Sequence, residues 1–89
     1  MPNQTLDRGM IISFLYNMEK YKNGAPKITL TKTKFTDVAK GSYYYTPVLW
    51  AQQYKITNGT SDTTFSPAKK CTRAEAVSFL YNIDKYWKK

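Results

Sequence analysis

The chain has 89 residues and a hydrophobic content of 42%, which suffices for one domain with a modest core and argues against disorder. Its formal net charge of +8 favours anionic partners such as nucleic acid, anionic wall polymers or acidic lipid headgroups, although scattered lysines on a solvated surface explain the charge equally well. A single cysteine, no histidine and six acids without an evident catalytic pair argue against an internal disulfide, a metal site, a cofactor and catalysis.

The first predicted helix begins after Asp7, whose carboxylate can accept a hydrogen bond from a backbone N–H of the first turn. We expect it to end near Gly24 and Pro26, because glycine and proline are typical of helix ends. Its apolar side chains are expected to form one stripe: Ile11, Phe14, Leu15 and Met18.

Residues 27–34 connect this helix to the middle of the chain. Ile28 and Leu30 alternate there with threonine and lysine, which fits either a short edge strand or an extended linker. The segment Phe35-Thr36-Asp37-Val38 follows as a compact apolar anchor and leads into a turn at Gly41-Ser42.

A second helix is predicted in the middle of the chain. Thr46 is expected as its N-cap, with Pro47 at the first helical position, where the missing N–H costs nothing. We expect the helix to end at Asn58-Gly59 and a loop over residues 60–67 to point Phe65 inward. The side chains expected to pack are Val48, Trp50, Ala51 and Tyr54.

The third predicted helix begins with a capping box, in which the hydroxyl of Thr72 and the carboxylate of Glu75 each accept from the other residue's backbone N–H. Its expected stripe is Ala76, Leu80 and Ile83, flanked by Val77 and Phe79. Arg73 is unusual, because a cation in the first turn opposes the helix dipole. A functional reason is therefore more plausible for Arg73 than a gain in helix stability.

The first and third helices repeat each other. A shift of 65 positions places Leu6–Tyr21 over Cys71–Tyr86, and the chain's two arginines, Arg8 and Arg73, then coincide. The other identical positions are Ser13, Phe14, Leu15, Tyr16, Asn17, Lys20 and Tyr21. A repeat of this kind predicts units that bury each other's faces.

The order of motifs resembles the S-layer homology family. One complete repeat is indicated by Phe35-Thr36-Asp37-Val38, Tyr44-Tyr45, Val48, Trp50-Ala51, Ile56, Gly59-Thr60, Phe65-Ser66-Pro67 and the signature Thr72-Arg73-Ala74-Glu75. Residues 2–22 resemble the second half of a preceding repeat, with Asp7-Arg8-Gly9-Met10 in place of the signature. We therefore expect a mainly α-helical single domain over residues 1–89. It comprises the half repeat 2–22, a connector 23–34 and a complete repeat 35–89, with three helices and long ordered loops.

The resemblance implies a non-catalytic module that anchors proteins at the bacterial surface. In the family, three repeats usually form a pseudo-threefold prism that binds a secondary cell-wall polysaccharide, often pyruvylated, in grooves between repeats. The signature arginine contacts the anionic sugar, which implies that role for Arg73 and, through the altered copy of the signature, for Arg8. Further candidate ligand contacts are Thr72, Gly59, Thr60, Tyr43 and Trp50. For Trp50, beside Val48 and Ala51, packing in the core is the more common use.

Elementary chemistry supports an anion site independently of the resemblance. A helix N-terminus offers free N–H groups and positive potential, and an arginine there adds a planar pair of donors that matches a carboxylate. Two other functions remain open. The same scaffold suits an intracellular binder of phosphate-bearing ligands, nucleotide or nucleic acid, or a structural repeat for protein interaction.

Location and oligomeric state follow as expectations. No stretch approaches membrane-spanning length, so we expect no membrane insertion, and no signal peptide is evident at the N-terminus. The protein is expected at the cell surface or secreted if the chain is part of a longer protein, and in the cytoplasm if the reading frame is complete. One and a half repeats leave apolar faces open, which favours a homodimer through the Leu6–Tyr21 helix over a compact monomer closed around Trp50 and Leu80.

Overall fold

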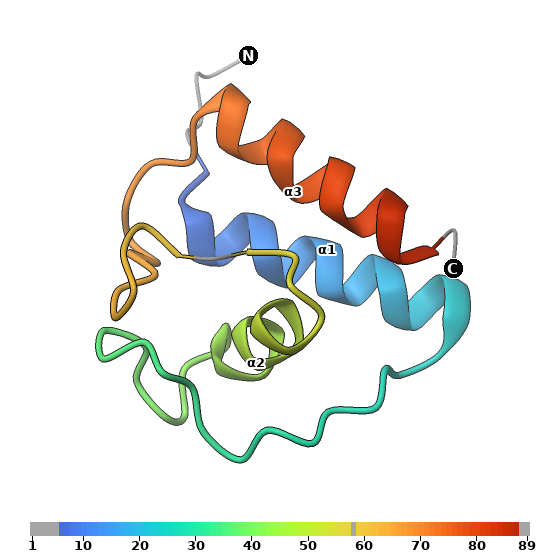
Figure 1. The fold of residues 1–89 in the computed structure, drawn as a ribbon, viewed down its shortest axis with the longest axis horizontal. Helices are drawn as coiled ribbons and strands as arrows, with labels where there is room; N and C mark the ends of the chain where they lie inside the picture. The colour runs from blue at the N-terminus through green and yellow to red at the C-terminus, as the bar shows by residue number, and fades with distance from the viewer. Residues whose placement is uncertain (1–5, 58, 88–89) are drawn as a thin grey trace.

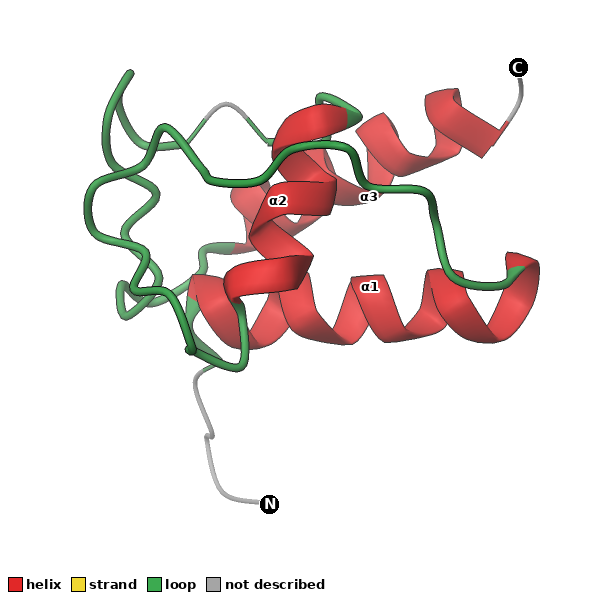
Figure 2. Ribbon diagram, turned by 90° about the horizontal axis from the view of Figure 1, so that it is seen from below, coloured by secondary structure: helices red, strands yellow, loops and turns green. Residues whose placement is uncertain are grey.

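Three helices and the long loops between them form the fold. The computed structural model describes residues 6–57 and 59–87, in which the helices are α1 (Arg8–Asn23), α2 (Tyr45–Gln53) and α3 (Arg73–Trp87). Helices α1 and α3 lie side by side and run in the same general direction, and α2 crosses beneath them at a steep angle (Figures 1 and 2). Within the described ranges there is no strand, so the predicted mainly α-helical class is confirmed.

Helix α1 has the expected ends. The Asp7 carboxylate accepts from the backbone N–H of Met10 at 2.8 Å. At the other end, Gly24 adopts a positive φ of 83° and donates its N–H to the carbonyl of Lys20 at 2.9 Å. This left-handed region favours glycine, which explains why the helix stops there.

The predicted ends of α2 were wrong. The helix begins at Tyr45, and Thr46 lies inside it instead of capping it. A backbone turn replaces the cap, because the N–H of Tyr45 donates to the carbonyl of Ser42 at 3.1 Å. The helix ends at Gln53, where the chain reverses through a positive φ of 61° at Lys55. The predicted end therefore lies too late in the chain, and Asn58 is outside the described residues.

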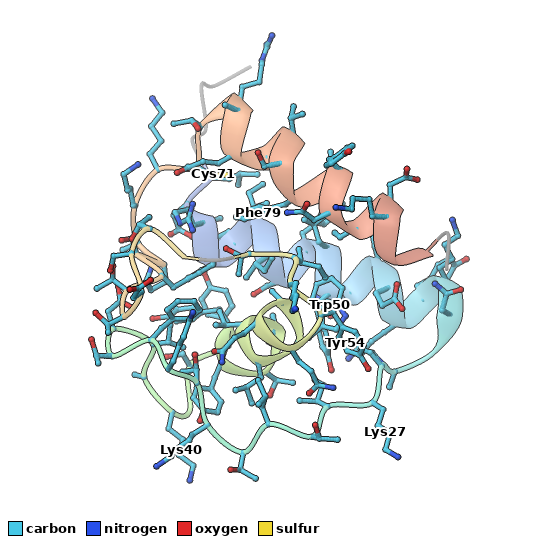
Figure 3. All side chains as sticks on the ribbon, in the orientation of Figure 1. Lys27, Lys40, Trp50, Tyr54, Cys71 and Phe79 are labelled. Atoms are coloured by element: carbon cyan, nitrogen blue, oxygen red, sulfur yellow. The ribbon has the colours of Figure 1, made fainter. Side chains whose placement is uncertain are left out.

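Residues 27–34 form an extended linker and no strand. Side chains of α2 and of Tyr54, the residue after it, bond to the backbone groups of this linker, which a partner strand would otherwise satisfy. Gln53 Oε1 accepts from the backbone N–H of Thr29 at 2.7 Å, and the hydroxyl of Tyr54 donates to the carbonyl of Lys27 at 2.6 Å. This linker is therefore attached to α2 along one side, and the Lys27 and Lys40 side chains point away from the core (Figure 3).

The core lies between the helices and the loop that follows α2. Its fully buried large side chains are Trp50, Phe35, Phe65, Ile12, Ile56, Ile83 and Val48. Trp50 occupies the centre, with the ring of Tyr16 from α1 at 5.6 Å between centroids (Figure 3). Helix α2 thus joins α1 to the loops through one aromatic cluster.

The buried faces of α1 and α3 differ from the predicted stripes. On α1, Ile12 is buried with Leu15, whereas Phe14 is mostly exposed. On α3, Phe79 is buried with Ile83, whereas half of Leu80 is exposed. Both helices carry apolar residues around much of their circumference, and periodicity does not reveal which side a neighbour covers.

Candidate functional site: a cationic groove between α1, α3 and the Phe65 loop

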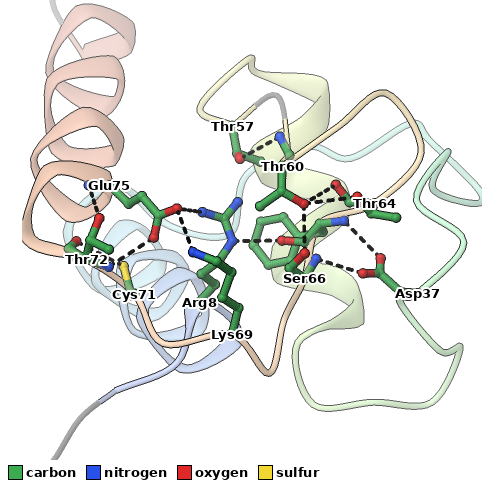
Figure 4. Close-up of polar contacts among 12 residues, drawn as sticks. Arg8, Asp37, Thr57, Thr60, Thr64, Ser66, Lys69, Cys71, Thr72 and Glu75 are labelled. Carbon is green, nitrogen blue, oxygen red and sulfur yellow. Dashed lines mark hydrogen bonds and ion pairs between the residues drawn. The ribbon is translucent and has the colours of Figure 1, made fainter.

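The loop after α2 is held by a carboxylate from the apolar anchor segment. Asp37 accepts from the backbone N–H of Phe65 at 2.9 Å through Oδ1 and from that of Ser66 at 2.8 Å through Oδ2 (Figure 4). Thr60, earlier in the same loop, shares hydroxyl hydrogen bonds with Thr64 at 3.0 Å and Ser66 at 2.7 Å. These bonds present the Phe65 carbonyl to α1 in a defined position.

Arg8 of α1 reaches that carbonyl and is buried. Its Nε donates to the carbonyl of Phe65 at 2.7 Å, and its Nη1 lies 3.0 Å from Oε2 of Glu75 in α3 (Figure 4). The guanidinium also stacks on the rings of Phe65 and Phe79, at 4.7 and 5.4 Å from their centroids. Arg8 therefore joins three segments that are far apart in the sequence, and only 3% of its side chain is exposed.

Glu75 has two separate bonding tasks. Its Oε1 accepts from the backbone N–H of Thr72 at 3.0 Å, while the Thr72 hydroxyl accepts from the Glu75 N–H at 3.1 Å, which is capping-box geometry. Its Oε2 faces Arg8 and lies 3.7 Å from Nζ of Lys69. The Thr72 N–H and the two cations lower the pKa of Glu75, so the carboxylate is ionised at neutral pH.

A groove of about 630 Å³ opens beside these residues. Its lining comes from α1, α3 and the loops on either side of Phe65: Arg8, Ile56, Thr57, Gly59, Thr60, Lys69, Ala74, Glu75, Ser78, Phe79 and Asn82. The charged members are two cations and one carboxylate, which leaves a net positive lining. Three threonine and serine hydroxyls accompany them.

Gly59 is required by the shape of this wall. Its φ is 79°, and a Cβ built on it would approach the Thr64 carbonyl oxygen and a Phe35 ring carbon to 2.5 Å each. Its N–H donates to the hydroxyl of Thr57 at 3.0 Å. Any side chain at this position would collide with the loop that bounds the groove.

The structure brings together three of the residues proposed from the sequence as ligand contacts. Arg8, Gly59 and Thr60 line the groove. Thr72 supports its edge through Glu75 without being part of the lining. The structure separates Arg73 from them, since it is exposed at the start of α3 and outside the groove.

The two candidate aromatics also lie outside the groove. Trp50 is fully buried in the core. Tyr43 is mostly exposed and packs edge-on against the ring of Tyr44, with 5.0 Å between centroids. The groove thus has no exposed aromatic ring among its described lining residues.

Sequence reasoning missed several residues of the site. Asn82 lines the groove and donates to the carbonyl of Ile56 at 2.9 Å, and it repeats as Asn17 in the first helix, which was an available signal. Asp37 was identified as part of the apolar anchor and of the repeat motif, without a role of its own. Ser78 repeats as Ser13 and carried the same signal, whereas Lys69 had no distinguishing feature, because its place in the groove depends on how the loop folds.

Cys71 lies near the groove and is partly buried. Burial, and then the nearby Glu75 carboxylate, raise the pKa of its thiol. The thiol is therefore protonated at neutral pH and a poor nucleophile. Among the residues that the structure describes, no three metal-binding side chains cluster, and no helix is long and apolar enough to cross a membrane.

Comparison with known proteins adds one assignment. The family model of the S-layer homology domain matches residues 34–77, which include α2, the Phe65 loop and the start of α3. No curated protein and no solved structure matches the chain. The half repeat predicted at residues 2–22 lies outside the match and stays a prediction, and its first residues, 2–5, lie outside the described part of the chain.

Proposed function

Residues 34–77 belong to the S-layer homology family, so the chain carries a cell-surface anchoring module, and we propose that it binds an anionic secondary cell-wall polysaccharide in the groove beside Arg8. Modules of this family bind and do not catalyse. The chain would recognise a carboxylate on the polymer, such as that of a pyruvylated sugar.

One observation carries the proposal. Arg8 uses Nε for the Phe65 carbonyl and Nη1 for Glu75, which leaves Nη2 without a bond to a described residue, and the Arg8 side chain lines the groove (Figure 4). An arginine fixed on two sides cannot rotate, so its remaining donors are already aimed before a ligand arrives. Such preorganised charged donors bind carboxylates strongly at low entropic cost.

The other lining groups suit a sugar that carries the acid. Lys69 adds a second positive charge at the mouth of the groove, where half of its side chain is exposed. Thr60 and Ser78 contribute hydroxyls from opposite walls. Glu75 disfavours a bare anion, but the two cations outnumber it. A polyhydroxylated ligand with one carboxylate therefore fits the lining better than a densely charged one.

Arg8 supports this role better than Arg73. Both occupy the same repeat position, but the Phe65 loop covers Arg8 and builds a groove around it, whereas Arg73 has no such loop among the described residues. We therefore place the ligand at Arg8. Ligand contact by Arg73 stays a prediction, which binding by the variant Arg73→Ala would test.

The test is a calorimetric titration of the chain with purified, pyruvylated wall polysaccharide and with the same polymer after mild acid has removed its pyruvyl groups. We expect binding of the first polymer and a loss of about tenfold or more in affinity for the second, as for one buried charge-assisted contact. Equal affinity for both polymers would contradict recognition of the carboxylate. If inorganic phosphate or a nucleotide displaces the polymer at equimolar concentration, the phosphate-binding alternative gains support instead.

Paired variants locate the site. Lys69→Ala removes a groove cation whose side chain is half exposed, so the fold should persist and the affinity should fall. Lys70→Ala is the matched control, because Lys70 is exposed, adjacent in sequence and outside the groove. Equal losses for both variants would show that general charge, and not the groove, attracts the polymer.

A further inference from the structure

A carboxylate lines the groove among its cations, and its position is fixed. Oε1 of Glu75 accepts from the backbone N–H of Thr72 at 3.0 Å. Its Oε2 lies 3.0 Å from Nη1 of Arg8 and 3.7 Å from Nζ of Lys69 (Figure 4). A side chain that is held through both oxygens cannot turn away when a ligand enters. Any anion in the groove therefore meets the negative charge of Glu75 together with the two cations.

Glu75 leaves only part of the cationic charge for a ligand. Arg8 has already given Nε to the Phe65 carbonyl and Nη1 to Glu75, and Lys69 contacts the same carboxylate. The two cations and the one carboxylate give the described lining a net charge of +1. One negative charge on a ligand balances this lining. A second negative charge finds no further cation among the described lining residues.

The cost of leaving water separates ligands with one charge from ligands with two. Attraction to the cations grows in proportion to the charge of the ligand, whereas the dehydration cost of an ion grows with the square of its charge. Repulsion by Glu75 also doubles when the charge doubles. A doubly charged group, such as a phosphate monoester, therefore fits this lining worse than a singly charged carboxylate.

We propose that Glu75 restricts the groove to ligands whose acidic group carries a single negative charge, and that it thereby excludes phosphate monoesters. This inference rests on the proposed anion site beside Arg8 and adds what that site rejects. Arg8 and Lys69 supply the attraction, while Glu75 sets the specificity. Glu75 is the single acid among the described lining residues, so one substitution tests the inference.

The variant Glu75→Gln removes this charge and keeps the shape of the side chain. Glutamine serves in a capping box as glutamate does, because its side-chain oxygen can still accept from the Thr72 N–H. The start of α3 should therefore persist, which circular dichroism checks. Asp62→Asn is the matched control, because it removes the same charge from an exposed loop residue outside the groove.

Amide NMR titrations with two sugar acids measure the selectivity. Glucuronate carries one negative charge, and glucose 6-phosphate carries close to two at pH 8, because the second pKa of a phosphate monoester is about 6. In Glu75→Gln we expect the affinity to rise about threefold for glucuronate and about tenfold for glucose 6-phosphate, since the lost charge acts twice on a doubly charged ligand. The ratio of the two affinities is the decisive quantity, because a groove that is merely loosened would lower both affinities alike. In Asp62→Asn this ratio should match that of the parent.

The pH dependence of binding tests the same point without a substitution. Between pH 8 and pH 5.5, glucose 6-phosphate takes up a proton, and the chain has no histidine that would titrate with it. Beside the cations Arg8 and Lys69, the lowered pKa of Glu75 keeps its carboxylate ionised, and the raised pKa of Cys71 keeps its thiol neutral. As the pH falls, the affinity of the parent for glucose 6-phosphate should rise about threefold, while that for glucuronate should stay constant.

The two possible failures give different results. If neither sugar acid shifts groove amides such as Gly59 and Thr60, in the parent or in Glu75→Gln, the anion site is absent and the inference fails together with the proposed function. If the affinity ratio is the same in the parent and in Glu75→Gln, the inference alone is overturned and the anion site stands. Tighter binding of glucose 6-phosphate by the parent at pH 8 than at pH 5.5 would overturn the inference in the same way.

Discussion

Arg8 and Asp37 never touch, yet they hold opposite sides of one peptide group. The Phe65–Ser66 peptide donates its N–H to Asp37 at 2.8 Å and accepts from Arg8 Nε at 2.7 Å through its carbonyl. This arrangement links the Phe35–Val38 segment to α1 through the loop that builds the groove. It explains how a residue outside the groove can control its shape: Asp37 positions the loop, the loop positions Arg8, and Arg8 lines the groove.

Removing the Asp37 carboxylate should loosen the loop. The variant Asp37→Ala leaves the backbone N–H groups of Phe65 and Ser66 without their charged acceptor, and we expect a loss of about 1.5–3 kcal/mol in the free energy of unfolding. Urea titration measures it. Asp62→Ala is the control, since Asp62 is an exposed acid in the same loop, and it should change stability by less than about 0.5 kcal/mol. Similar losses in both variants would contradict the role of Asp37.

The two repeat-related arginines should differ in their effect on stability. Arg8→Ala breaks a buried ion pair and leaves Glu75 and the Phe65 carbonyl without that partner. We expect a loss of roughly 2–4 kcal/mol in the free energy of unfolding. The loss is smaller than for a fully broken buried pair because Glu75 keeps its cap bonds to Thr72. Arg73→Ala removes an exposed cation that opposes the helix dipole, so stability should stay constant or rise slightly. Thermal and urea unfolding of both variants would measure the contrast, and equal losses would refute it.

Glu75 predicts a pH dependence of stability. The Thr72 N–H, and then Arg8 and Lys69, lower the pKa of Glu75 in the folded chain. The stabilisation from ionised Glu75 is therefore complete above the pKa of the unfolded chain, which is about 4.3. It is lost as the pH falls from that pKa through the lower pKa of the folded chain. Unfolding free energies measured by urea between neutral pH and acid should decline less steeply in Glu75→Gln than in the parent. Identical slopes would show that the Glu75 interactions do not stabilise the fold.

Gly59 should tolerate no side chain. Gly59→Ala forces a Cβ to within 2.5 Å of the Thr64 carbonyl oxygen and the Phe35 ring, at a positive φ. We expect a loss of about 1–3 kcal/mol, as for overpacking in a core. Gly41→Ala is an informative control: its φ of 95° is equally unfavourable, but no atom lies within 4 Å of the added Cβ. Urea unfolding measures both variants, and the loss for Gly59→Ala beyond that for Gly41→Ala reports the steric contact alone. Equal losses in the two variants would contradict the close packing of this wall.

Local signals predicted the helices well, and tertiary contacts decided the rest. The cap of α1 by Asp7 and its end at Gly24 depend on neighbouring residues, which a sequence pattern can show. The start of α2 depends instead on a backbone turn at Ser42, which leaves no side-chain signal, and Thr46 was therefore misread as a cap. In the same way, the extended linker is fixed by glutamine side chains of α2, which strand periodicity cannot reveal.

The candidate site was predicted in part, for a related reason. The repeat revealed both arginines, but only the fold shows that the Phe65 loop closes over Arg8 and leaves Arg73 exposed. Trp50, a candidate sugar contact, is used by the core. The sequence thus identified the residue type and the repeat position, while the place of the groove follows from the packing of a distant loop on α1.

The most direct measurement is a titration of ¹⁵N-labelled chain with a short, pyruvylated fragment of wall polysaccharide, followed by amide NMR shifts. The account predicts saturable shifts at groove amides such as Gly59, Thr60 and Ser78, with little change at Val77 or Tyr81 on the exposed side of α3. The Lys69→Ala variant should weaken these shifts at equal ligand concentration, and Lys70→Ala should not. Shifts concentrated around Arg73, or unchanged spectra at millimolar ligand, would contradict binding in the Arg8 groove.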